Sequence, residues 1–345
     1  MTLSCTAFGE VMLRLDPAGG VRLVQADRFE VRFTGAEANV AASLAQSGIG
    51  TQVVSAVPDD MLGEASLAFL RRFGVDVASV LRRPGRLGLF YLEPGGAGRP
   101  TEVIYDRANS VFARTGPDAY DWAAILNGQD WLHVSGTAAA VGPAAAAALD
   151  RALAEAQAAG VSVSLDVNYR SRLWDAQRAG RVLRSFLDRV DVLLGAGEEI
   201  VTVLDQPAPP GWSPGRPLRT EQRIALMEDV RDRCGLRAVA GTERSEPLTG
   251  TGGETTLRGL LSTVEGTAVS RARLLTDERG RVGTGDAYAA GVIRGLLLGH
   301  AAQEVVEFAA AAAQLKQSIA GDVNIASVAE VEHALATTRP ARLRR

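Results

Sequence analysis

The sequence has almost no lysine. Lys316 is the single lysine among 37 basic residues, and all the others are arginine. A Walker-A phosphate loop needs a Gly-Lys-Ser/Thr sequence, and pyridoxal-phosphate enzymes and Schiff-base aldolases need an amine nucleophile. No such loop is present, and Lys316 stands in FAAAAAQLKQS, which is typical of an ordinary amphipathic helix. Any phosphate chemistry must therefore use backbone amides, arginines and a magnesium ion.

Metal-binding and redox residues are also scarce. The two cysteines, Cys5 and Cys234, give neither a disulfide framework nor a metal-ligand spacing. His133, His300 and His333 are scattered without the i,i+4 spacing of a zinc site. These absences exclude a disulfide-stabilised secreted domain and a zinc hydrolase.

Long apolar runs and one-sided charge are missing too. No apolar run is long enough to span a bilayer, and the N-terminal MTLSCTAFGEVMLRL lacks the basic region and cleavage site of a signal peptide. The net charge is −3 with acids and bases interspersed, so no basic block suggests nucleic acid. We therefore expect a cytoplasmic protein that binds neither nucleic acid nor a membrane.

The 345 residues are 46% hydrophobic, enough for a large core. From Asp130 onward, apolar strands alternate with helices, which predicts an α/β fold with a doubly wound, mostly parallel sheet. Two earlier blocks alternate apolar and polar residues and predict strands with one solvated face: Met12–Leu15, Val21–Val24, Phe29–Phe33, Arg86–Glu93 and Thr101–Asp106. We expect a single α/β domain over residues 1–338, with a small β-sheet lid inserted at about 11–34 and 86–112, and a frayed tail at 339–345.

The most informative segment is RVGTGDAYAAGVIRGLLLG, residues 281–299, in which Gly283, Thr284, Gly285 and Asp286 lead into an amphipathic helix. Glycines before a helix let backbone amides converge on an anion, and the helix dipole adds positive charge there. Asp286 could accept the proton of a hydroxyl that attacks a bound phosphate. Alternatively, Asp286 only caps the helix and the glycines only form a turn.

Two further segments carry polar residues where ligands bind. In GAEANVA, Asn39 falls in the first turn of a predicted helix, where its amide could reach ligand hydroxyls or satisfy its own helix terminus. In SLDVNYR, Asp166, Asn168 and Arg170 close an apolar strand, at the edge where open α/β sheets bind ligands. Asp166 could instead cap the following loop.

With these motifs the chain resembles the ribokinase-like, phosphofructokinase-B type, sugar kinase family. Gly283–Gly291 matches the C-terminal signature of that family, and Gly35–Ala41 matches the N-terminal one. FGEVMLRLDP, GAEANVA, DVNYRSRLW and GDVNIASVAEVE make 2-keto-3-deoxygluconate kinases the most similar subgroup, and the matches run from residue 8 to about 332. The resemblance implies one large ribokinase-like α/β domain with a β lid, and phosphoryl transfer from ATP with Mg²⁺.

The resemblance also implies residue roles. Asp286 would be the catalytic base, with Gly283, Thr284 and Gly285 forming the anion hole. The residues implied to bind substrate are Gly35, Asn39, Phe90, Tyr105, Arg107 and Arg170. Those implied to bind the nucleotide are Asn168, Glu199, Gly241, Thr242 and Gly285, with Glu199 reaching the metal through water. Two arginines suit a carboxylate, which each can bind bidentately, although Arg107 could instead form a surface ion pair with Asp106 or a neighbour.

Three positions depart from the pattern of the family. Ala196 replaces the asparagine of an Asn-x-x-Glu motif that organises magnesium waters, and Gly280 replaces an aspartate, leaving Asp277 and Glu278 as displaced acids. Phe90 replaces a lid tyrosine and loses one hydroxyl contact. These departures concern metal handling and substrate choice more than the fold.

We therefore predict ATP-dependent phosphorylation of the terminal hydroxyl of a small sugar acid, with 2-keto-3-deoxygluconate as the leading candidate. One alternative is a kinase for a neutral sugar such as fructose or ribose, which would not need Arg107 and Arg170. Another is a weakly catalytic sugar-acid-binding protein, suggested by Ala196 and Gly280. Apolar lid residues such as Phe29–Phe33 also suggest a homo-oligomer formed through the lid.

Overall fold

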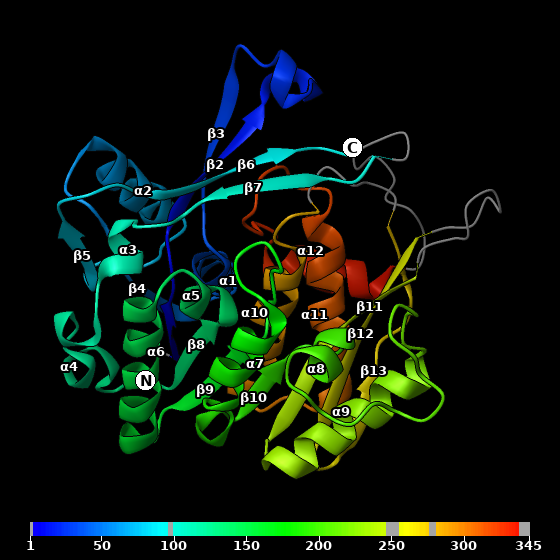
Figure 1. The fold of residues 1–345 in the computed structure, drawn as a ribbon. Helices are drawn as coiled ribbons and strands as arrows, with labels where there is room; N and C mark the ends of the chain where they lie inside the picture. Colours follow the sequence, from blue (N-terminus) through cyan, green and yellow to red (C-terminus); the bar gives the residue numbers. More distant parts are fainter. Residues whose placement is uncertain (1–2, 96–98, 246–254, 276–280, 338–345) are drawn as a thin grey trace.

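A large sheet forms the centre of the computed structural model, which describes residues 3–95, 99–245, 255–275 and 281–337 (Figure 1). The strand order is β13-β12-β11-β10-β9-β8-β1-β4-β5, with β14 paired to β12. The strands are β1 Ser4–Phe8, β4 Gly50–Pro58, β5 Val80–Arg83, β8 Trp131–Ser135, β9 Ser162–Asp166, β10 Val192–Leu194, β11 Ala238–Ser245, β12 Thr256–Thr263, β13 Gly266–Val269 and β14 Arg273–Leu274. All pairs from β11 to β5 are parallel, and β12 and β13 form an antiparallel edge. The predicted α/β class is therefore confirmed.

Helices cover both faces of this sheet. One layer holds α1 Ala36–Gln46, α2 Met61–Arg71, α10 Thr284–Leu297 and α11 Ala302–Lys316, with α12 Val328–Ala336 packed on α11. The other holds α3 Val111–Arg114, α4 Trp122–Leu126, α5 Gly136–Ala140, α6 Pro143–Ala159, α7 Ala176–Arg184, α8 Glu198–Thr202 and α9 Thr220–Cys234. Strand residues alternate between the two cores: Leu132 and Val134 face α6, whereas Trp131 faces α10. Among the described residues, no helix has the length and apolar character needed to cross a bilayer.

A second, four-stranded sheet forms the lid, at the top of Figure 1. Its strands, in the order β3-β2-β6-β7, are β2 Met12–Pro17, β3 Phe29–Thr34, β6 Gly88–Glu93 and β7 Glu102–Asp106. They fall within the two stretches in which lid strands were predicted. On the side of the lid that faces the main domain, Phe90 and Tyr105 pack with Val282, the residue before the predicted anion hole.

The strand predicted at Val21–Val24 is wrong. This segment contains the short 3₁₀ helix Leu23–Gln25, and Val24 is 84% exposed. Gly19 and Gly20 both adopt positive φ and turn the chain away from β2. The backbone amide of Leu23 then binds the carboxylate of Glu93 instead of a neighbouring strand.

Candidate active site

The first turn of α10 faces open space. Its N-cap, Gly283, has φ 84°, and a Cβ there would lie 1.9 Å from the carbonyl oxygen of Asp322, so only glycine fits. At Gly285, by contrast, an added Cβ would meet no atom within 4 Å. Because the first amides of a helix lack intrahelical partners and carry the positive end of its dipole, this open space suits an anion.

Asp286 lies in that first turn and does not cap the helix. Its Oδ2 accepts a hydrogen bond of 2.7 Å from Nδ2 of Asn39, a residue 247 positions earlier on α1. Asn39 is buried, and its Nδ2 donates a second hydrogen bond to the hydroxyl oxygen of Thr34. Neither of these bonds satisfies the terminus of its own helix. Its Oδ1 has no hydrogen-bond partner within the described part of the chain. A buried acceptor left unpaired is costly, so a ligand hydroxyl that donates to Oδ1 would be stabilised here.

The carboxyl group of Asp286 has a raised pKa. Burial raises its pKa to about 7, and the charges of Asp166 and Asp322 add to the effect. The hydrogen bond from Asn39 and the charge of Arg170 lower the pKa, but they do not cancel the rise. A base with a pKa near the working pH is the most effective general base.

Two more acids surround the candidate base. Burial raises the pKa of both Glu37 and Asp166 to about 7. The charge of Arg107 opposes the rise at Glu37, and that of Arg170 opposes it at Asp166. Glu37, which accepts a hydrogen bond from Ser135, was not among the predicted site residues. The charges of the two arginines therefore act on this cluster of three acids, Glu37, Asp166 and Asp286.

Arg107 does not form the alternative surface ion pair with Asp106. It is buried, and its Nε donates to Oε2 of Glu10 at 2.6 Å, whereas Asp106 binds Arg86. The physical reason is that the chain turns inward after β7, back toward the main domain. The guanidinium carbon also lies 6.0 Å from the ring centre of Tyr105.

Arg170 is exposed at the end of the loop that follows β9. Its NH1 approaches the carbonyl oxygen of Tyr169 at 3.4 Å. Before it, Asn168 has φ 37° and donates its backbone N–H to Oδ1 of Asp166 at 3.0 Å. Asp166 therefore caps this loop through Oδ1, as the second interpretation of its sequence position predicted.

The residues predicted to bind the nucleotide follow neighbouring strands. Glu199 lies in the first turn of α8, after β10, and its Oε1 accepts the N–H of Gly197 at 2.9 Å. Gly241 and the half-buried Thr242 lie on β11 beside it. A Cβ on Gly241 would be 2.5 Å from that of Ala196, so these two small residues are in close contact.

Sequence reasoning missed a set of charged residues near the predicted anion hole. Arg14 on lid strand β2 forms an ion pair with Asp322, whose Oδ2 has no hydrogen-bond partner among the described residues. Lys316 is fully buried at the end of α11, and its ammonium donates to the carbonyls of Ile319 and Gly321 at 3.0 and 2.8 Å. Burial lowers the pKa of Lys316 to about 8. In the sequence, these charged residues were indicated only by a lone lysine in an alanine-rich helix and by the polar stretch that follows it.

Comparison with known proteins decides the family. Residues 2–214 match the pfkB family carbohydrate kinases. A 2-dehydro-3-deoxygalactonokinase of Haloferax volcanii is 32% identical, over 97% of each chain. The chain belongs to the pfkB family of carbohydrate kinases. The structure of a 2-dehydro-3-deoxygluconokinase from Thermotoga maritima is 36% identical and covers 98% of this chain and 99% of its own, with a TM-score of 0.88.

A more distant structure shows the same fold. A candidate ribokinase II of Escherichia coli, solved in complex with ATP and Mg²⁺, is 19% identical and has a TM-score of 0.76. It covers 97% of this chain and 99% of its own. The ribokinase-like fold that the sequence predicted for this kinase is therefore confirmed, and so is its class as a carbohydrate kinase.

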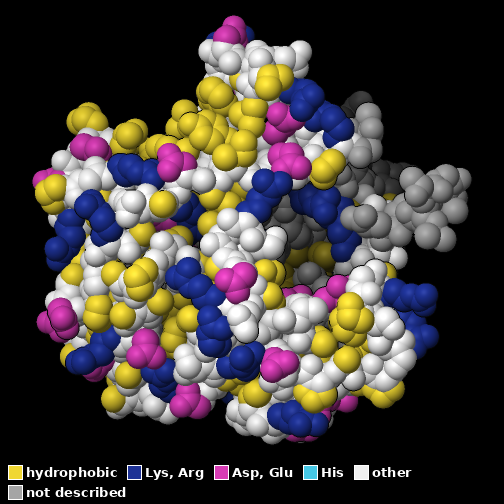
Figure 2. Space-filling view, in the orientation of Figure 1, with side chains coloured by type: hydrophobic (Ala, Val, Ile, Leu, Met, Phe, Trp, Pro, Cys, Tyr) yellow, Lys and Arg dark blue, Asp and Glu magenta, His cyan; other side chains and the backbone are white. Residues whose placement is uncertain are grey.

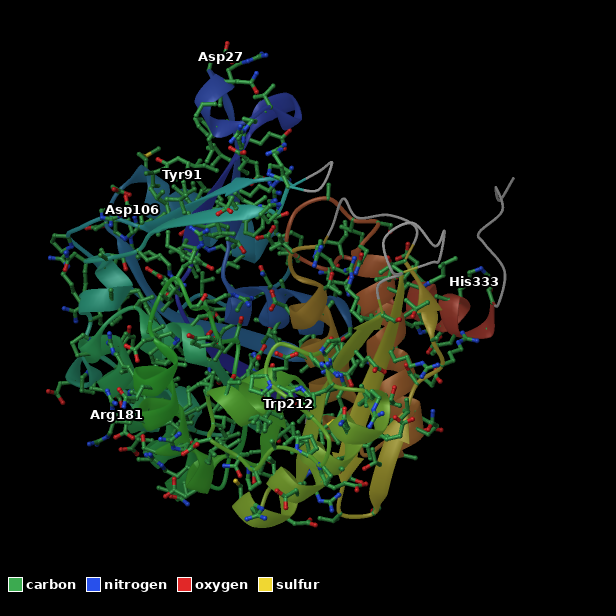
Figure 3. The ribbon with its side chains drawn as sticks, turned by 45° about the vertical axis from the view of Figure 1, so that its right-hand side comes forward. Asp27, Tyr91, Asp106, Arg181, Trp212 and His333 are labelled. Carbon is green, nitrogen blue, oxygen red and sulfur yellow. The ribbon has the colours of Figure 1, made fainter. Side chains whose placement is uncertain are left out.

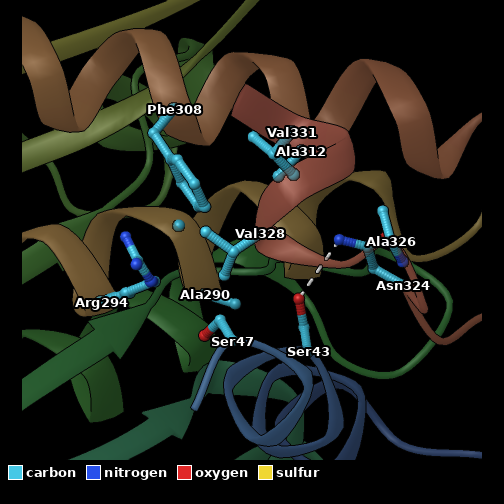
Figure 4. A pocket seen from close by; sticks show the side chains of 11 residues that line it. Ser43, Ser47, Ala290, Arg294, Phe308, Ala312, Asn324, Ala326, Val328 and Val331 are labelled. Atoms are coloured by element: carbon cyan, nitrogen blue, oxygen red, sulfur yellow. Dashed lines mark hydrogen bonds between the residues drawn. The ribbon is translucent and has the colours of Figure 1, made fainter. Parts of the chain in front are cut away.

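A small polar cavity in this kinase lies between α1, α10 and α11 (Figure 4). Its volume is about 10 Å³, and Ser43, Ser47, Arg294 and Asn324 line it. The Nε of Arg294 has no hydrogen-bond partner among the described residues, and the guanidinium lies 4.5 Å above the ring of Phe308. One water would fill a polar space of this size, so the cavity is structural and too small for a sugar.

The family departures at Gly280, Asp277 and Glu278 lie outside the described residues, as does the predicted frayed tail at 339–345.

Proposed function

We propose that this carbohydrate kinase transfers the γ-phosphoryl group of ATP to the terminal hydroxyl of a 2-keto-3-deoxy sugar acid, with 2-keto-3-deoxygluconate as the leading candidate. The observation that carries the proposal is the partly buried Asn39–Asp286 pair at the N-terminus of α10, with the charges of Arg107 and Arg170 nearby. Relatives named for the gluconate and the galactonate form of this acid support the substrate class. These two acids differ in configuration at one carbon, so the assay must include both.

The chemistry follows from the positions of the residues. Asp286 would remove the proton of the attacking hydroxyl, while the amides of Gly283–Asp286 would stabilise the charge that spreads over the transferring phosphoryl group. The free Oδ1 of Asn39 would accept a hydrogen bond from a sugar hydroxyl and fix its position beside the base. Closure of the lid would exclude water, so that the sugar hydroxyl is phosphorylated instead.

On the sugar side, Gly35 stands at the start of α1, and Phe90 and Tyr105 line the inner face of the lid. Their tilted rings are 5.9 Å apart and would cover the carbon chain of the acid. Arg107 and Arg170 would bind its carboxylate from two sides. A neutral sugar offers no partner for these two charges.

On the nucleotide side, Asn168 and Glu199 follow the ends of β9 and β10, Gly241 and Thr242 lie on the neighbouring strand β11, and all four would contact ATP. Within the described residues, no group of three acidic, histidine or cysteine side chains is arranged to hold a metal ion. Mg²⁺ keeps several waters and binds mainly through substrate phosphates, so Glu199 fits an indirect role through water. Bound Mg²⁺ would neutralise phosphate charge.

A coupled ATP-consumption assay tests this function. The panel contains 2-keto-3-deoxygluconate, 2-keto-3-deoxygalactonate, fructose and ribose, each with and without Mg²⁺. We expect the highest kcat/KM for one of the two acids, only with Mg²⁺, and a product phosphorylated at the terminal carbon. A preference for fructose or ribose would favour the neutral-sugar alternative, and binding of the acid without turnover would favour the binding-protein alternative.

We also propose that a second copy of the chain covers the outer face of the lid. Strand pairing places Val31, Leu15, Tyr91 and Ile104 in one row across that face. Val31 and Ile104 are 59% and 50% exposed, Figure 2 shows hydrophobic side chains gathered on the lid, and Tyr91 is labelled there in Figure 3. Exposed apolar rows of this kind mark interaction surfaces.

Light scattering tests the lid contact. The wild type should have the mass of a dimer or higher oligomer, and Val31→Glu should shift it to the mass of a monomer without lowering the melting temperature of the main domain. A monomeric wild type would contradict this proposal and leave the kinase assignment intact. The cytoplasm stays the expected location, since the free Cys5 and Cys234 suit a reducing compartment.

A further inference from the structure

The chain passes between the main domain and the lid at four places, and all four meet at one residue, Glu10. The crossings run from β1 to β2, from β3 to α1, from β5 to β6, and from β7 to α3. Glu10 lies in the first of them. In Figure 1 the crossings lie where the lid sheet joins the main domain.

Each of the other crossings contacts Glu10 directly. In the fourth crossing, Nε of Arg107 donates to Oε2 of Glu10 at 2.6 Å and the hydroxyl of Ser110 donates to Oε1. Where the third crossing enters β6, a Cβ on Gly88 would be 2.3 Å from the same Oε1. In the second, a Cβ on Gly35 would be 2.4 Å from the carbonyl oxygen of Glu10. Both glycines therefore let the backbone approach this residue.

Stability alone does not account for a charge in this place. Glu10 is 1% exposed and Arg107 is 5% exposed. Burying two charges costs hydration free energy, which their mutual attraction only partly offsets. Replacing a buried ion pair by apolar residues of similar size often leaves a protein equally stable. The pair also uses only one nitrogen of the guanidinium, because within the described residues the two terminal nitrogens of Arg107 form no hydrogen bond. Those two nitrogens form the planar fork that binds a carboxylate.

The place of the pair also matters for lid movement. When a lid rotates, the residues at its crossings move least and the strand ends move most. Arg107 is bound at the crossings, whereas the rings of Phe90 and Tyr105 belong to the moving strands. Through its bond to Glu10 the guanidinium would keep its position beside the main domain as the lid moves.

We propose that Glu10 is a positioning residue for substrate recognition: it fixes Arg107 at the hinge so that the carboxylate of the sugar acid is bound before the lid closes. This inference deepens the proposed function and rests on it. Glu10 itself does not touch the substrate, so its effect must pass through Arg107.

The test is a set of variants measured by calorimetry without ATP and by steady-state kinetics. Glu10→Gln should weaken binding of the acid and raise its KM by ~10–100-fold, since it removes a charge-assisted hydrogen bond from Arg107. The kcat at saturating acid, the KM for ATP and the kcat/KM for a neutral ketose should change less than about threefold. Melting curves show whether each variant is folded. If Glu10→Gln does not fold, Glu10→Asp keeps the charge but is too short to reach Arg107, and it should show the same selective rise in KM.

Glu93→Gln is the matched control. Glu93 is another buried lid carboxylate, paired with Arg22 and Arg99 at 3.1 and 3.0 Å, but it lies at the far end of β6. Its substitution should leave the KM for the acid unchanged. A purely structural role for Glu10 would make the two variants behave alike.

Coupling to Arg107 gives the decisive comparison. In an Arg107→Ala background, adding Glu10→Gln should change the KM for the acid less than about twofold, because the residue through which Glu10 acts is gone. Additive effects, or a folded Glu10→Gln with the KM of the wild type, would overturn the inference and leave the proposed function standing. A wild type that phosphorylates neither acid defeats the proposed function itself, and that result is seen before any variant is made.

Discussion

Replacing Asp286 by asparagine should remove most of the turnover while keeping the site intact. The amide has nearly the shape of the carboxylate, and its oxygen can still accept the hydrogen bond from Asn39 that is 2.7 Å long in the wild type. It cannot take a proton from the sugar hydroxyl. General-base catalysis contributes ~10²–10⁴-fold, so kcat should fall by that factor, which corresponds to roughly 3–5 kcal/mol in the barrier.

The pH dependence of the wild type gives a second readout. Because burial raises the pKa of Asp286 to about 7, kcat/KM should fall as the pH drops below about 7 and the base becomes protonated. The Asp286→Asn variant should lack this dependence on the base.

The same substitution should stabilise the protein at alkaline pH. A carboxyl whose pKa is higher in the folded than in the unfolded state makes the wild type lose stability as the pH rises from about 4 to about 7. Asparagine has no such loss, so the melting temperature of the variant minus that of the wild type should be larger at pH 8 than at pH 5. The assays are coupled ATP consumption and thermal melting at both pH values. Turnover within a few-fold of the wild type would refute the role of Asp286 as base, whatever the melting curves show.

Two other substitutions probe the phosphate and carboxylate contacts. Gly285→Val should melt near the wild-type temperature, because a Cβ added there would meet no atom of the described residues within 4 Å. It should lose most turnover, because the side chain would occupy the space proposed for the γ-phosphoryl group; wild-type turnover would show that the phosphate lies elsewhere. Arg170→Ala should lower kcat/KM for the sugar acid by ~10–150-fold and barely affect a neutral analogue, and Arg170→Lys should rescue it only in part, since an ammonium lacks the planar fork. Equal losses on the acid and the neutral sugar would mean that Arg170 only supports the loop.

The sequence predicted what local patterns encode. Strands and helices after Asp130, the helix that follows Gly35 and the helix that follows Gly283 are all present, because apolar periodicity and glycine positions act within a few residues of each other. The alternation of apolar and polar residues at Val21–Val24 led to a wrong prediction of a strand. A strand also needs a neighbouring strand to pair with, and Gly19 and Gly20 turn the chain away from β2.

Long-range pairing could not be predicted from the same patterns. Arg14 and Asp322 are 308 positions apart, and Glu10 and Arg107 are 97 apart. A sequence pattern treats such charges as exposed, since burial of a charge becomes acceptable only when the fold brings its partner to it. Lys316 was expected on an ordinary amphipathic helix for the same reason, yet backbone carbonyls of the following loop surround its ammonium.

A structure of the kinase with 2-keto-3-deoxygluconate and a non-hydrolysable ATP analogue tests the central claim most directly, through the distance from the carboxylate of Asp286 to the terminal hydroxyl oxygen of the acid. We expect about 2.6–3.2 Å, the reach of a general base, with the γ-phosphate against the amides of residues 283–286 and the substrate carboxylate between Arg107 and Arg170. A terminal hydroxyl out of reach of Asp286, or a γ-phosphate bound away from the first turn of α10, would contradict the account.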